Sequence, residues 1–143
     1  MNPNNLLSKT KIDVARGAGG AGVAILGDRI LVAGTKKMIF TDFNGTILSE
    51  TKIDAGYYEG GVGVAIIGEK ILIAGTKKAI FTDLNGMILS ETEIDVGYLE
   101  GGADVAIIKE IIVVCGTKAL IVGDTFSIQL YEKPVGPCFC TIS

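Results

Sequence analysis

The sequence predicts an all-β protein built from a repeated unit, and three observations support this prediction. Isoleucine and valine dominate the apolar residues, and β-branched side chains favour strands over helices. Residues 34–54 (GTKKMIFTDFNGTILSETKID) and 75–95 (GTKKAIFTDLNGMILSETEID) agree at seventeen of twenty-one positions. Each copy contains an Asn-Gly pair between two apolar runs, at 44–45 and 85–86, which is the strongest short-range signal for a β-hairpin.

The repeat has a period of 41 residues and occurs three times. Gly34, Gly75 and Gly116 mark the same position in the three copies, and the third copy is the most diverged. Residues 6–13 (LLSKTKID) match the last quarter of a unit, so the chain opens with an additional strand. We divide the single domain of 143 residues into segments at 1–13 (extra outer strand), 14–54, 55–95 and 96–136 (repeats) and 137–143 (tail).

The second unit illustrates the expected elements in order. Its four apolar segments are GVAII (63–67), KILIAGT (70–76), KAIFTDL (78–84) and MILSETEID (87–95). A Gly-Glu turn, a Lys77-Lys78 corner and an Asn85-Gly86 turn join them, and we expect a type I′ turn at Asn85-Gly86 because both residue types tolerate a positive φ. Only the connection DAGYYEGGVG between units is long. Each unit should therefore be a four-stranded antiparallel meander.

Three such meanders favour blades of the propeller type, because four-stranded blades have a period near this length. The alternative is a β-trefoil, which also has three repeats in a chain of this size. The runs VAII, ILIA and IIVVC are continuously apolar instead of alternating, as expected where both faces of a strand are covered. Inner blade strands are covered in this way, which favours the propeller reading.

Residues 61–89 (GVGVAIIGEKILIAGTKKAIFTDLNGMIL) resemble an NHL-type propeller repeat. The shared pattern is a Gly-Val-Ala-apolar strand, a short turn, an apolar strand ending in Ala, and an aromatic-Asp-x-x-Gly hairpin. The resemblance extends over residues 22 to about 130 and implies blade geometry. It also implies about six blades in a family member, whereas this chain has three and a fragment.

Three blades do not close a ring, because propellers have four to eight. Both ends of an open arc would expose apolar faces, so we expect other subunits to cover them. The predicted function is non-enzymatic self-assembly of a structural scaffold, as a six-bladed dimer or an open filament. The N-terminal strand could pair with the last blade of a neighbour, with Leu6, Leu7 and Ile12 supplying the apolar contacts.

A second candidate function is a lectin-like binding module on one face of the blades. The meander places the Lys-Lys corner and the long connection together, and aromatic and charged side chains on such loops could hold a small ligand or a glycan. The candidate residues are Tyr57, Tyr58, Glu59, Tyr98, Glu100, Lys36, Lys37, Lys77 and Lys78, with Lys118 in the third copy. The alternative is that these lysines pair with Asp54, Asp95 and nearby Glu side chains.

Several other patterns have a structural explanation. GAGGAG at 17–22 fits G-x-G-x-x-G, but a strand follows it where a dinucleotide site needs a helix. The paired glycines at 19–20, 60–61 and 101–102 indicate crowding of the backbone near a common axis. Asp42, Asp83 and their counterpart Asp124 precede the hairpin turns and are expected to cap the turn backbone.

Neither a catalytic site nor a metal site is expected. The chain contains no histidine, so it has no Ser-His or Cys-His dyad, and we predict that it is not an enzyme and uses no cofactor. Cys138 and Cys140 could suggest a metal site, but structural zinc needs four ligands and no histidine can complete the set. Cys115 replaces Ala33 and Ala74 within an apolar run and is expected in the core.

The composition limits the classes of molecule that could be partners of this protein. A net charge of −3 and a pI near 4.9 make nucleic acid an improbable partner, and no apolar run is long enough to span a membrane. We expect no signal peptide, because no basic segment followed by an apolar run opens the sequence, and its localisation is not indicated. Scarce amides with many Ile and Lys residues fit either heat adaptation or an AT-rich genome.

Overall fold

The computed structural model describes residues 8–15, 19–56, 60–97, 101–124 and 130–133. These residues form three antiparallel sheets of four strands, and each sheet is made of consecutive strands. The strands of the first sheet are β1 (Gly22–Leu26), β2 (Arg29–Ala33), β3 (Lys37–Thr41) and β4 (Ile47–Lys52). The second sheet contains β5 (Gly63–Ile67), β6 (Lys70–Ala74), β7 (Lys78–Asp83) and β8 (Ile88–Glu93). The third contains β9 (Asp104–Ile108), β10 (Ile111–Cys115), β11 (Leu120–Asp124) and β12 (Leu130–Lys133).

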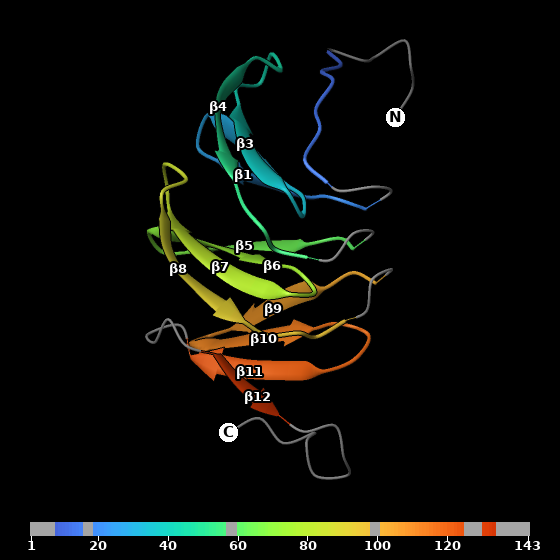
Figure 1. Ribbon diagram of the computed structural model, residues 1–143. Coiled ribbons are helices and arrows are strands. Elements are labelled where there is room, and N and C mark those ends of the chain that lie inside the picture. The colour runs from blue at the N-terminus through green and yellow to red at the C-terminus, as the bar shows by residue number, and fades with distance from the viewer. Residues whose placement is uncertain (1–7, 16–18, 57–59, 98–100, 125–129, 134–143) are drawn as a thin grey trace.

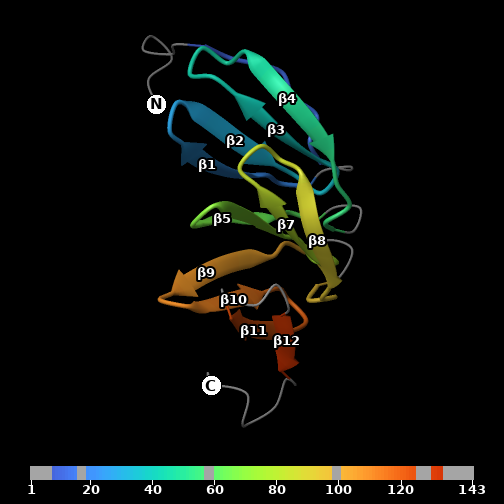
Figure 2. The same cartoon turned by 90° about the vertical axis from the view of Figure 1, so that its left-hand side faces the viewer.

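The three sheets stack in a row with their inner strands side by side (Figures 1 and 2). Strand β5 contacts β1 on one side and β9 on the other. The predicted four-strand meander is therefore confirmed in each unit, with strands within a few residues of their expected positions. The order of the strands gives no support to the β-trefoil alternative, because each sheet is complete within one repeat.

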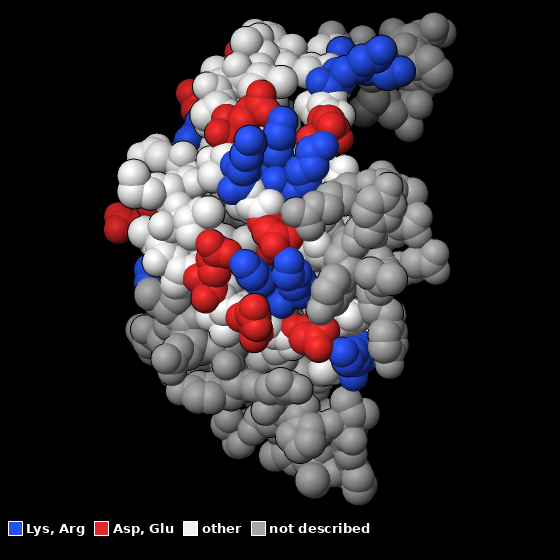
Figure 3. Space-filling model, in the orientation of Figure 1, with Lys and Arg blue, Asp and Glu red and all other residues white. Residues whose placement is uncertain are grey.

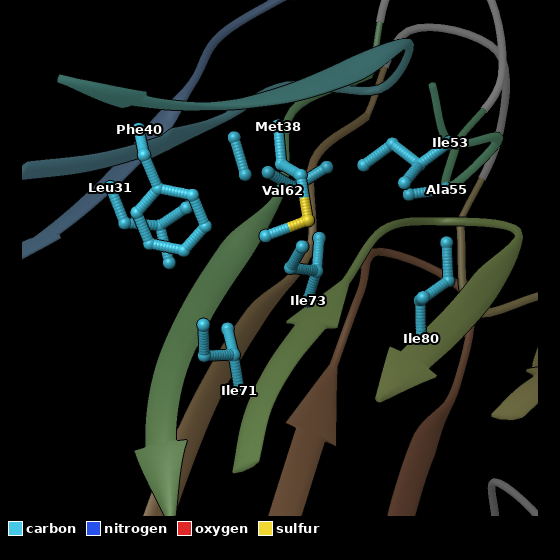
Figure 4. Packing of buried hydrophobic residues seen from close by; sticks show 10 residues of the cluster. Leu31, Met38, Phe40, Ile53, Ala55, Val62, Ile71, Ile73 and Ile80 are labelled. Carbon is cyan, nitrogen blue, oxygen red and sulfur yellow. The ribbon is translucent and has the colours of Figure 1, made fainter. Parts of the chain in front are cut away.

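The core consists of two apolar layers between the sheets. Strand β6 shows how the middle sheet contributes to both layers: Ile71 and Ile73 face the first sheet, and Leu72 faces the third. Figure 4 shows the first layer, in which side chains from the first and second sheets meet. Its fully buried large side chains include Leu31, Met38, Phe40, Ile71, Ile73 and Ile80. The continuous apolar runs of the sequence are explained because both faces of the middle sheet are covered.

The hairpin turns between the third and fourth strands differ from the expected type I′ turn. Gly45 and Gly86 have φ values of 86° and 89°, whereas the Asn residues before them do not have a positive φ. The amide of Gly86 donates to the carbonyl of Asp83 at 3.2 Å, and the strand register shifts just before the turn. This is a turn that ends in a left-handed glycine and a bulge, so only the glycine needs the unusual backbone conformation.

The capping role predicted for the turn aspartates is confirmed in the first two units. The Asp83 carboxylate accepts hydrogen bonds from the amides of Asn85 and Met87, both at 2.9 Å. The Asp42 carboxylate accepts the corresponding two bonds at the same distance. The side chain of Asp124 lies outside the described residues.

Replacing Asp83 with alanine should lower the free energy of unfolding by about 1–2 kcal/mol, because two turn amides lose a charged acceptor. Asp83→Asn is the matched control, since its amide oxygen can still accept these bonds. Urea denaturation of the two variants and the wild type measures the difference. Equal stability of Asp83→Ala and wild type would show that the cap contributes nothing.

Of the predicted N-terminal outer strand, the structure describes residues 8–13, and the pairing of this strand with a neighbouring subunit stays a prediction. Residues 8–14 lie beside the first sheet and pair with no strand among the described residues, and a β-strand needs a neighbouring edge to complete its hydrogen bonds. Of the predicted contact residues, Ile12 is 41% exposed, and Leu6 and Leu7 lie outside the described residues. Residues 8–14 lie next to the first sheet, at the far end of the row from β12 (Figure 1).

Candidate functional site

A short segment precedes each unit, and its contact with the corner between the second and third strands of that unit occurs three times. The carbonyl of Ala55 accepts hydrogen bonds from the amides of Lys77 and Lys78, at 3.0 and 2.9 Å. The carbonyl of Val14 binds the corresponding corner of the first unit, and that of Val96 binds the corner of the third. The predicted proximity of the Lys-Lys corner and the connection is therefore correct.

The lysines of this face form ion pairs with acidic side chains. Lys36, Lys77 and Lys118 lie 2.7, 2.5 and 2.8 Å from Asp13, Asp54 and Asp95, respectively. Lys37 and Lys78 each lie 3.1 Å from a glutamate of the adjacent strand, Glu50 and Glu91. Figure 3 shows basic and acidic side chains interleaved on this side of the molecule. The structure therefore agrees with the alternative given above, in which these lysines pair with acidic side chains.

The aromatic half of the predicted ligand face lies outside the described residues. This applies to Tyr57, Tyr58, Glu59, Tyr98 and Glu100. A ligand at this face stays a prediction, because the structure places the lysines but not these residues. The paired lysines are half-buried or exposed, so each ion pair contributes little to stability.

The pKa of Asp13 should be lower than its ordinary value of 3.8. The hydrogen bond from Lys36 lowers the pKa, and the positive charge of the same side chain lowers it further. Because the folded-state pKa of Asp13 is lowered, its ion pair with Lys36 stabilises the docking of residues 8–14 at pH values above the usual pKa of a carboxylate. This contribution is lost as the pH falls through the folded-state pKa.

An NMR titration of the Asp13 carboxyl carbon should give a midpoint below 3.8, and Lys36→Met should raise that midpoint. Lys37→Met is the control, because Lys37 acts only weakly and through its charge. If Lys36→Met leaves the titration unchanged, the segment does not dock through this pair in solution.

The inner strands surround an open cavity of about 620 Å³. Its lining includes the starts of β1, β5 and β9 at Gly22, Gly63 and Asp104. Among the paired glycines, Gly60 shows the predicted crowding, since a Cβ on it would lie 2.6 Å from the carbonyl oxygen of Gly101. A Cβ on Gly61 would be in ordinary contact with Gly20, so the crowding does not extend to every pair. Among the described residues, no group of three side chains suited to binding a metal comes together.

The third unit departs from the repeat at this cavity. A Cβ on Gly22 would lie 2.9 Å from a methyl carbon of Val64, and one on Gly63 would lie 3.0 Å from the Cα of Asp104. Close packing of the next sheet therefore explains both glycines. Asp104 stands at the same position in the third unit, and its carboxylate accepts the amide of Val105 at 2.9 Å. Aligning the three copies would have identified this substitution from the sequence.

The outer face of the first sheet exposes large apolar side chains. We call it the N-terminal end face and define it by Val23, Ile25, Phe43 and Ile47, with exposed fractions of 69, 66, 53 and 39%. The residues 41 positions later are Val64, Ile66, Leu84 and Ile88, of which Val64, Leu84 and Ile88 pack against the first core layer. The exposed side chains of the first unit therefore correspond to side chains that bind a preceding sheet in the second unit.

The outer face of the third sheet is also apolar, and the part of it near β9 and β10 is exposed, whereas Val122 on the same face is buried. We call this face the C-terminal end face and define it by Ala106, Val113, Cys115 and Leu120, which are partly or fully exposed. A shallow cavity of about 200 Å³ lies over its inner half. The prediction that Cys115 lies in the core is wrong, because its side chain is exposed and no further sheet among the described residues covers it as the next sheet covers Ala33 and Ala74.

Two solved structures resemble this fold. BamB from Moraxella catarrhalis matches with a TM-score of 0.58 and 14% identity over 80% of this chain and 36% of BamB. The N-terminal domain of Nup159 matches with a TM-score of 0.50 and 11% identity over 85% of this chain and 35% of that protein. Both are β-propellers, so the propeller-type fold is shown, and the chain spans about a third of each.

The comparisons give no closer assignment. No family model matches the chain, and no curated protein sequence matches it. The specific NHL assignment therefore stays a prediction. The described residues also contain no helix long and apolar enough to cross a membrane.

Proposed function

We propose that the chain is a non-enzymatic scaffold of the propeller type that assembles with copies of itself through its two end faces. The propeller-like neighbours support a scaffold or interaction domain. The absence of histidine from the sequence removes the usual bases that activate a serine or cysteine nucleophile. The proposal therefore assigns the function to the surfaces of the sheets.

One observation carries this proposal: the N-terminal end face has the chemistry of an internal junction without its partner. In the second unit, Leu84 and Ile88 reach the first sheet, and Arg29 donates a hydrogen bond to the carbonyl of Leu84 at 2.9 Å. In the first unit, Phe43 and Ile47 hold the same positions and are exposed. Apolar side chains grouped in this way typically mark a binding surface.

The expected strength of the contact follows from the size of this surface. Full burial of an exposed side chain of this size contributes roughly 1.5–3 kcal/mol, and each of these four contributes less because part of its surface is already buried. Association costs about 4–15 kcal/mol in lost translational and rotational freedom, so only part of this energy appears as affinity. Contacts from the opposing face add to the total, and we expect reversible association in the micromolar range.

Sedimentation velocity on the wild-type chain across a concentration series tests the proposal. We expect species heavier than the 14.9 kDa monomer whose share increases with concentration. A single monomeric species at every concentration up to about 100 µM, far above the expected dissociation constant, would overturn the proposal. In that case a different protein would have to cover the end faces.

A further inference from the structure

The N-terminal segment has the position of an outer strand that belongs to a preceding sheet. The hydroxyl of Thr10 donates to the carbonyl of Gly45 at 2.8 Å, and Asp13 pairs with Lys36. The second junction has the matching arrangement, since the hydroxyl oxygen of Thr51 lies 3.1 Å from the Cβ position of Gly86. Thr51 belongs to β4, the outer strand of the first sheet. Residues 8–13 therefore stand where β4 stands, one unit earlier.

The sequence of this segment agrees with that of a complete outer strand. Residues 8–13 (SKTKID) match residues 49–54 (SETKID) at five of six positions. Within the part of the chain that the structure describes, the segment has docked on the first sheet but has no ladder partner. An unpaired strand of this kind can complete the edge of another sheet.

The outer strand of the third sheet departs most from the repeat. The residues after Asp124 are Thr-Phe-Ser, so the Asn-Gly turn that closes the other two hairpins is missing. Lys133 is opposite Leu120, at the place where Thr51 is opposite Met38. Strand β11 therefore pairs with an outer strand that departs from the repeat in its turn and its sequence.

We propose that the partner of the N-terminal end face is the C-terminal end face of a second copy, and that residues 8–13 replace β12 beside β11 of that copy. This inference rests on the proposed self-assembly and identifies its partner. Continuing the internal junctions by one more unit places β11 of the second copy next to residues 8–13. The register of the other two sheets then sets Thr10 opposite Leu120 and Lys11 opposite Ala119.

A designed disulfide tests this register. The background carries Cys115→Ala, Cys138→Ser and Cys140→Ser, and Thr10→Cys is combined with Leu120→Cys. Residues directly opposite in an antiparallel pair have Cα atoms about 4.5–5.5 Å apart, within the range of a disulfide. Within one chain, Thr10 lies beside the first sheet and Leu120 belongs to the third sheet, at the other end of the row. A bond between positions 10 and 120 must therefore join two chains.

The control combines Thr92→Cys with Leu120→Cys, because Thr92 is already paired with Ala79 inside the second sheet. We expect about tenfold more covalent dimer for the 10/120 pair than for this control, since pairing raises the local concentration of the thiols. A dimer yield equal to that of the control would overturn the exchange. So would a complete bond within one chain between Leu120→Cys and Lys133→Cys at assembling concentrations.

Sedimentation of the same variants under reducing conditions separates the two proposals. Assembly without the 10/120 crosslink would contradict the strand exchange and leave self-assembly in place. Monomers under all conditions would contradict both. Assembly with the crosslink supports both.

Asp104 should weaken this junction, which gives a second test. At the internal junctions the corresponding glycines have no room for a Cβ, because the next sheet lies within about 3 Å. We expect Asp104→Gly to increase the association constant about tenfold, which corresponds to about 1.4 kcal/mol in the free energy of association. Asp104→Ala removes the charge but keeps the Cβ, so it should tighten association less. Equal effects of the two variants would show that the charge matters and the close approach does not.

Discussion

Val23→Asp combined with Ile25→Asp should abolish self-association while leaving the chain folded. The two side chains are 69 and 66% exposed, so the monomer loses little packing. In the assembly the same positions would bury two carboxylates against an apolar face, which is strongly unfavourable without partners. A loss of about 4 kcal/mol corresponds to roughly a thousandfold higher dissociation constant.

Light scattering after size-exclusion chromatography measures this effect, with Met87→Asp as the matched control. Met87 is 68% exposed but lies at the β7–β8 turn, away from both end faces. The control should assemble like the wild type. An unchanged mass for the Val23/Ile25 variant would remove the N-terminal end face from the interface, provided that its far-ultraviolet circular dichroism matches the wild type.

Gly75→Ala should destabilise the chain by about 3 kcal/mol and lower its melting temperature by roughly 10 °C. A Cβ at this position would collide with the carbonyl group of Ala55, whose carbon atom lies 2.5 Å away. That carbonyl already accepts the amides of Lys77 and Lys78, so it cannot move without breaking two hydrogen bonds. The strain falls on backbone atoms, which adapt less readily than side chains.

Gly20→Ala is the control for this prediction, because nothing lies within 4 Å of its Cβ position. It should change stability by no more than about 0.5 kcal/mol. Calorimetry on both variants gives the comparison. If the two glycines tolerate alanine equally well, the close contact between connection and corner does not exist in solution.

The sequence was sufficient to predict the sheets because each strand carries its own local signal. Continuous apolar runs, Gly-containing turns and the 41-residue period indicated the strands of the meander, and the turn carboxylates of Asp42 and Asp83 have the predicted partners. The type of the Asn-Gly turn was predicted wrongly. Asn tolerates a positive φ but does not require it, and the bulge leaves that conformation to the glycine alone.

The end faces were harder to predict, because exposure depends on what lies beyond a sheet. Cys115 belongs to an apolar strand like Ala33 and Ala74, and nothing in the sequence of that strand reveals that the side chain of Cys115 is exposed. The same limit applies to Val23 and Ile25, whose neighbours in sequence resemble those of Val64 and Ile66. Residues 8–13 have a strand-like sequence but pair with no edge among the described residues of their own chain, so local preference alone does not make them a strand.

A cryo-electron microscopy reconstruction of the assembled wild-type particle would show how the chains meet. We expect every junction between chains to join the first sheet of one copy to the third sheet of another, so that two chains contribute six sheets around one axis or more chains continue the row. Residues 8–13 should lie beside β11 of the neighbouring copy. Particles in which two first sheets face each other, or in which each chain remains a separate arc of three sheets, would contradict this arrangement.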